Sequence, residues 1–98
     1  MKLILTPQAT RDLEAIGDWS AIDSPFRAVT FTDELLSHLQ VIRATPNAFP
    51  LVEKYASRGV RRYAWRDYLA FYRVRGDVVS VFHITHGARN TSERSLDD

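Results

Sequence analysis

The sequence predicts an α+β fold in which a helical hairpin packs on one face of a mainly antiparallel sheet. Apolar residues recur at helical spacing between Pro7 and Ala44, and beyond Gly59 the pattern changes to runs rich in β-branched and aromatic residues. The 98 residues fit one domain, because two cores of half this size would each be marginal. We therefore expect a single domain over residues 1–98, in which residues 91–98 form a polar, flexible tail.

A short strand and a first helix are predicted at the start of the chain. The strand covers Lys2–Leu5, and the helix covers Pro7–Ile22. Thr6 can cap this helix, and a proline at the first helical position loses no hydrogen bond. One face of the helix carries Ala9, Leu13, Ile16 and Ser20.

A second helix is predicted over Ser24–Ala44. It opens on the same signal as the first, a hydroxyl residue followed by Pro25, and it ends where Pro46 disfavours helix at the preceding residue. Because the link between the two helices is short, they should form an antiparallel hairpin. The stripe that this helix buries comprises Ala28, Phe31, Leu35, Leu39 and Ile42.

Three strands are predicted after a long loop. The loop, residues 45–59, follows neither period and holds one helical turn around Leu51–Tyr55. The strands cover Val60–Trp65, Tyr68–Arg75 and Val78–His86, and two-residue turns separate them. Successive strands joined by such short turns pair in antiparallel fashion.

Alternation assigns residues to the two faces of this sheet. One face of the middle strand carries Tyr68, Ala70, Tyr72 and Val74, and the other carries Leu69, Phe71, Arg73 and Arg75. In the last strand, Phe82 and Ile84 alternate with Val81, His83 and Thr85. We expect one face to cover the helices and the other to stay open, lined by Arg73, Arg75 and His83. His86 should point towards the helices.

Composition excludes several classes of protein. The chain has no cysteine, so it can form neither a disulfide framework nor a cysteine-bearing zinc site. Its three histidines show no metal-ligand spacing, and we expect no metal and no cofactor. The apolar run at the N-terminus is too short for a signal peptide or a membrane span, so we expect a cytoplasmic protein with no membrane association.

Charge is distributed unevenly along the chain. Up to Glu53 there are four basic and seven acidic residues, whereas from Lys54 to Arg94 there are nine basic and three acidic residues. The basic side chains are almost all arginines, which favour planar, bidentate contacts. Such a basic half suits an acidic partner, either nucleic acid or an anionic peptide.

Several strings of this sequence resemble the ParE branch of the ParE/RelE toxin superfamily. They occur in the family's order and cover nearly the whole chain: Pro7-Gln8-Ala9, Ser24-Pro25-Phe26-Arg27-Ala28, Gly59-Val60-Arg61-Arg62, Tyr68-Leu69-Ala70-Phe71-Tyr72-Arg73-Val74 and His86-Gly87-Ala88-Arg89-Asn90. The chain departs from the family's pattern at His83, where an arginine is common, and at Asn90, where an aspartate is usual. The predicted order of strand, two helices, loop and three strands is also that of the family.

The resemblance implies the toxin component of a type II toxin–antitoxin system. A ParE-like member would arrest growth by inhibiting DNA gyrase, and a ParD-like or similar small antitoxin would neutralise it. Such a toxin is a binding poison rather than an enzyme. The expected target-binding residues are Arg61, Arg73, His83 and Arg89.

Two alternatives stay open. On a RelE-like reading, the chain is a ribosome-dependent, metal-independent mRNA endoribonuclease whose catalytic residues are Glu53, Arg61, Arg73 and His83. His83 would act as acid or base while the arginines bind phosphate. The chain has only two lysines and no tyrosine after Tyr72, which disfavours the lysine-cluster site of such enzymes. The other alternative is a non-toxic interaction domain on the same fold.

Overall fold

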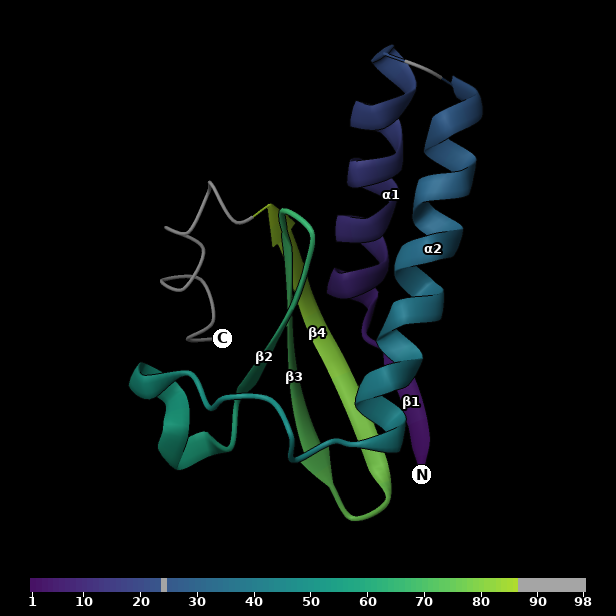
Figure 1. The fold of residues 1–98 in the computed structure, drawn as a ribbon. Coiled ribbons are helices and arrows are strands. Elements are labelled where there is room, and N and C mark those ends of the chain that lie inside the picture. The colour runs from purple at the N-terminus through teal and green to yellow at the C-terminus, as the bar shows by residue number, and fades with distance from the viewer. Residues whose placement is uncertain (24, 87–98) are drawn as a thin grey trace.

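A helical hairpin and a four-stranded sheet form the body of the protein in the computed structural model, which describes residues 1–23 and 25–86. Helices α1 (Pro7–Asp23) and α2 (Pro25–Ala44) lie together on one side of the sheet (Figure 1). The predicted bounds of both helices are confirmed to within one residue. In the described part of the chain, no helix is long and apolar enough to cross a membrane.

Helix α1 begins, and helix α2 packs, as the sequence predicts. The Thr6 hydroxyl accepts a hydrogen bond from the Ala9 amide at 3.2 Å, which caps α1. The stripe of α2 is buried at Leu35, Leu39 and Ile42, with Phe31 packed against the same cluster. The predicted stripe positions Ser20 and Ala28, and the predicted cap at Ser24, lie outside the side chains that the structure describes.

The sheet is mainly antiparallel, as predicted. Its strands are β1 (Lys2–Leu5), β2 (Arg61–Trp65), β3 (Tyr68–Arg75) and β4 (Val78–His86), in the order β1-β4-β3-β2. β3 pairs antiparallel with both of its neighbours, whereas β1 pairs parallel with β4. The first strand of the described chain, β1, therefore lies beside the last described one, β4.

A bulge in β4 changes which residues face the helices. Phe71 pairs with His83 but Tyr72 pairs with Val81, so Phe82 is an extra residue on β4. Val81 and Ile84 both lie in the core beneath the helices, while Phe82 packs on the opposite side of the sheet. The prediction that Phe82 and Ile84 share a face is therefore wrong, because strict alternation does not continue through a bulge.

The face of the sheet away from the helices is partly covered. Its central residue Phe71 is buried by a second cluster formed with Val52, Tyr55 and Val60. Two of these residues come from the segment around a short 3-10 helix, η1 (Glu53–Arg58), on the side of the sheet opposite to the hairpin (Figure 1). The prediction of an open second face is thus wrong at its centre, because the loop brings its own apolar residues to cover Phe71.

Candidate functional site

Arg61 lies on the face of β2 that points towards the helices. It pairs with Tyr72, which belongs to the core beneath the hairpin, and its guanidinium donates a hydrogen bond to the Phe49 carbonyl at 2.6 Å. The Tyr72 hydroxyl donates to the Pro46 carbonyl, also at 2.6 Å. Arg61 and Tyr72 together hold the segment that follows α2 against the sheet.

Ionisation of Tyr72 should destabilise the protein at high pH. Burial raises the pKa of Tyr72 from 10.0 to about 12, although the positive charge of Arg61 lowers it in part. The native state therefore holds this proton more tightly than the unfolded chain does. Stability should be unaffected below pH 10 and should fall as the pH rises towards 12.

Alkaline unfolding curves of the wild type and of Tyr72→Phe would measure this effect. The substitution should remove most of the dependence on pH in that range. A smaller part should persist, because burial also raises the pKa of Tyr63. An equal slope in both proteins would contradict the assignment to Tyr72.

His83 is held between α1 and the second cluster. Its Nδ1 atom lies 2.8 Å from Oδ2 of Asp12, so an Nδ1–H group donates to the carboxylate, and its ring stacks on Phe71 at 5.8 Å between centroids. The same Asp12 oxygen accepts a hydrogen bond from the Ile84 amide at 3.0 Å. Both side chains are mostly buried, with 14% of Asp12 and 16% of His83 exposed.

These contacts make His83 part of the joint between helix and sheet. Within the described chain, its Nε2 atom is buried and has no hydrogen-bond partner. Asp12 reaches the backbone of β4 just beyond the residues that pair with β1, where the edge of β4 would otherwise be unpaired. The carboxylate therefore caps the edge of the sheet at the bulge.

Arg73 lies on the opposite face of the sheet from Arg61. Its guanidinium carbon is 5.0 Å from the centre of the Phe82 ring, and the residue is half-buried. Arg75 follows on the same face and is exposed. The predicted grouping of Arg73 and Arg75 on one face is confirmed.

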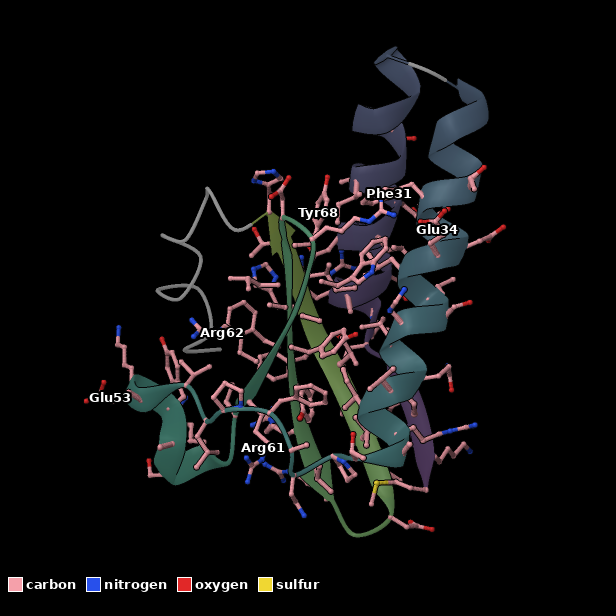
Figure 2. The ribbon with its side chains drawn as sticks, in the orientation of Figure 1. Phe31, Glu34, Glu53, Arg61, Arg62 and Tyr68 are labelled. Carbon is pink, nitrogen blue, oxygen red and sulfur yellow. The ribbon has the colours of Figure 1, made fainter. Side chains whose placement is uncertain are left out.

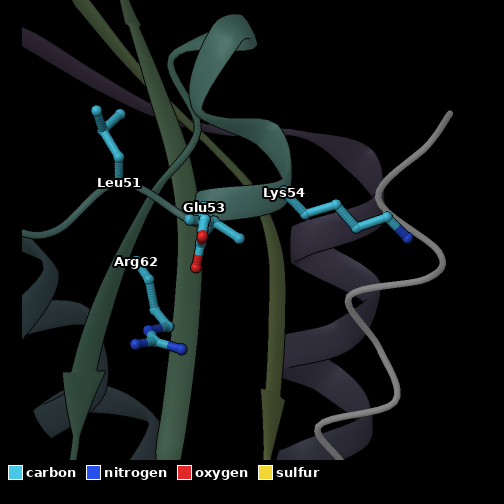
Figure 3. A pocket seen from close by; sticks show the side chains of 5 residues that line it. Leu51, Glu53, Lys54 and Arg62 are labelled. Carbon is cyan, nitrogen blue, oxygen red and sulfur yellow. The ribbon is translucent and has the colours of Figure 1, made fainter.

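Glu53 lines a surface pocket of about 590 Å³ with Leu51, Val52, Lys54 and Arg62 (Figure 3). Its neighbour in this pocket is Arg62 rather than Arg61. Adjacent strand residues point to opposite faces of the sheet, so Arg61 is turned towards the helices. Arg62 pairs with Phe71 and is turned towards the face that the second cluster covers.

The structure does not bring the four candidate catalytic residues together. Arg61 is on the helix side, whereas Arg73 is on the other face. His83 is bonded to Asp12, and Glu53 lies beside Arg62. Arg89 and the expected tail at residues 91–98 lie outside the described residues.

An aromatic cluster joins α2 to the end of the sheet (Figure 2). The Phe31 ring lies 5.3 Å from Trp65 and 5.1 Å from Tyr68, between centroids. Arg66 covers Trp65 at 4.8 Å and pairs with Glu34 at 3.2 Å. The ring of His86 contacts Tyr68, as expected for a residue on the helix side. Trp65 is therefore a core residue of the hairpin–sheet interface.

Sequence reasoning overlooked two charged residues. Asp12 is not among the residues predicted for the buried face of α1, yet it follows Ala9 by three positions and precedes Ile16 by four, so it borders that face. Arg62 was passed over for its neighbour Arg61. The aromatic residues Tyr63 and Trp65 indicate which face of β2 points to the core, and alternation places Arg61 on that face and Arg62 on the other.

Comparison with known proteins places this arrangement among toxin folds. The structure is similar to a solved chain described as "Chromosomal ParDE TA system from P. aeruginosa", with a TM-score of 0.75 and 22% sequence identity over 88% of this chain and 95% of that chain. No curated protein sequence matches the chain. At this identity, the structural likeness defines the fold: a ParE-like α+β domain.

The sequence itself gives the family. The model of the family described as "ParE toxin of type II toxin-antitoxin system, parDE" matches residues 3–91. This chain belongs to the ParE toxin family, and membership of a type II toxin–antitoxin system implies an antitoxin partner. Among the described residues, no group of three potential ligand side chains could hold a metal ion.

Proposed function

We propose that this toxin arrests growth by inhibiting DNA gyrase, and that a ParD-like antitoxin neutralises it. The main support is the match to the ParE family, which extends over residues 3–91. The protein then acts by binding its target and needs no catalytic group of its own. The alternative is the endoribonuclease activity of RelE-like toxins, and an experiment must distinguish this activity from gyrase inhibition.

The positions of the candidate catalytic residues favour a binding mode of action. Cleavage of RNA needs an acid, a base and phosphate-binding cations around one ribose–phosphate unit. Arg61 and Arg73 lie on opposite faces of the sheet, and His83 Nδ1 is bonded to Asp12. A single substrate phosphate therefore could not contact both arginines without a rearrangement of the sheet.

The expected target-binding residues then divide into two groups. Arg73 has a guanidinium on the surface of the sheet, and we propose it as a direct contact with the target, together with Arg89. Arg61 and His83 bond to Phe49 and Asp12, so we propose that they position the loop and helix α1 instead.

Two assays on one preparation of purified toxin test the function. The protein should inhibit gyrase supercoiling, and it should leave mRNA in the ribosomal A site uncut. His83→Ala should retain gyrase inhibition per folded molecule, whereas loss of a general acid or base would lower a cleavage rate by about a hundredfold or more. The folded fraction of each variant is measured by circular dichroism.

The opposite outcomes assign a different function. Codon-specific cleavage of mRNA that is lost in His83→Ala would overturn the gyrase proposal and make Glu53, Arg61, Arg73 and His83 a catalytic group. A protein that neither inhibits gyrase nor cuts mRNA, and does not arrest growth when expressed alone, would be a non-toxic interaction domain.

A further inference from the structure

Among the described residues, the second cluster leaves uncovered one end of the sheet face that points away from the helices. Two neighbouring rows of side chains cross three strands there. In one row Ser80 of β4 lies between Ile4 and Arg73, and in the next Val78 lies between Lys2 and Arg75. We call this surface the basic patch; it consists of Lys2, Ile4, Arg73, Arg75, Val78 and Ser80.

The orientation of these residues follows from their neighbours in each strand. Leu3 and Leu5 pack into the core beneath the helices, so Lys2 and Ile4 point the other way. Val79 is a core residue, which turns Val78 and Ser80 outwards. The patch therefore has Lys2 on one side and Arg73 and Arg75 on the other. Between these cations, Ile4, Val78 and Ser80 form a floor that is apolar except for one hydroxyl.

The cations of the basic patch are available to a partner. Lys2 and Arg75 are exposed, and Arg73 is fixed over the Phe82 ring. Within the described chain none of the three forms an ion pair with a carboxylate. Asp77, in the turn between β3 and β4, borders the patch, since its backbone carbonyl accepts a hydrogen bond from the Lys2 amide at 2.7 Å. Three cations against this carboxylate leave the patch with a positive charge. The floor is also accessible, since 41% of Ile4 is exposed.

We propose that the basic patch binds an acidic, extended segment of the antitoxin. The proposal rests on the antitoxin neutralisation proposed above and gives it a surface. Arg73 and Arg75 are two positions apart on one strand, so their Cα atoms are about 6.5–7 Å apart. Alternate side chains of an extended peptide have the same spacing, which allows successive carboxylates to meet both guanidinium groups. The segment would cover Arg73 and so block a target contact.

A peptide fits this surface better than nucleic acid does. The patch offers three cations around Ile4 and Val78, whereas nucleic-acid sites follow the phosphate backbone with longer series of cations. Apolar side chains between the carboxylates of a peptide would lie on the Ile4–Val78 floor.

A titration followed by nuclear magnetic resonance tests the proposal on the whole protein. The probe is a synthetic peptide in which glutamate alternates with threonine, and its matched control has glutamine in place of glutamate. The glutamate peptide should shift the amide signals of Ile4, Arg75 and Ser80 and should bind about tenfold more tightly than the glutamine peptide at low salt. High salt should remove most of this preference.

Charge reversal locates the binding surface. Lys2→Glu with Arg75→Glu should abolish the preference for the glutamate peptide. Arg11→Glu with Arg43→Glu changes the net charge equally at exposed helix positions and should alter binding by less than about twofold. Equal losses in both variants, or shifts outside the patch, would overturn the proposal. So would tighter binding of a short oligothymidylate than of the peptide. Gyrase is absent from this experiment, so its outcome is independent of the supercoiling assay.

Discussion

Replacing Asp12 with alanine should lower the free energy of unfolding by about 2–3 kcal/mol. The carboxylate accepts hydrogen bonds from the Ile84 amide and from His83, and its removal leaves both donors in a mostly buried place. The loss would fall at the joint between α1 and β4. Chemical denaturation of the purified protein measures it directly.

Two further variants separate this joint from a general effect of charge. Asp12→Asn keeps one carbonyl acceptor and should cost less than the alanine change. Glu14→Ala removes an exposed carboxylate of the same helix and should alter stability by less than about 0.5 kcal/mol. If Asp12→Ala and Glu14→Ala are equally mild, the Asp12–Ile84 contact does not hold the sheet edge.

Phe71→Ala should cost about 3–5 kcal/mol, because the ring is fully buried and a cavity would replace it. Phe71 contacts the second cluster on one side of the sheet and supports the His83 ring. Its loss should release the segment around η1 while the helical hairpin stays packed. Hydrogen exchange of the amides in residues 52–60 reports the release.

Leu69→Ala is the matched control for this change. Leu69 lies on the same face of the same strand but is only partly buried, so its truncation should cost less. Protection in residues 52–60 should persist in that variant. Unchanged protection of these amides in Phe71→Ala would show that the second cluster does not hold the segment around η1 on the sheet.

The elements of this fold could be predicted nearly to the residue, but the contacts between layers could not. Helix starts carry local signals, such as the Thr6 cap followed by Pro7, and the two-residue turns delimit the strands. The bulge at Phe82 leaves no such signal, because Val81 and Phe82 are both apolar and either of them could face the core. Because Phe82 is the extra residue of this bulge, it lies on the face of the sheet opposite to Ile84 rather than on the same face.

The candidate site was harder to predict because it depended on that face assignment. Arg61 and Arg62 are chemically identical neighbours, and only the phase of β2 decides which of them lies beside Glu53. His83 was expected on an open surface, yet Phe71 and Asp12 enclose it. The residue types alone predict that the surface is basic. Which of the charged residues lie together on one face depends on the pairing of elements that are distant in sequence.

The parallel pairing of β1 with β4 also bears on the order in which the chain folds. β3 and β4 are neighbours in sequence and close a turn of two residues, whereas Lys2 must find Val78 across nearly the whole chain. Closing the longer loop costs more entropy, and contacts of long sequence separation form slowly. Lys2 and Ile4 reach their places only with this last closure. A nascent chain thus lacks a complete basic patch until β4 has been synthesised.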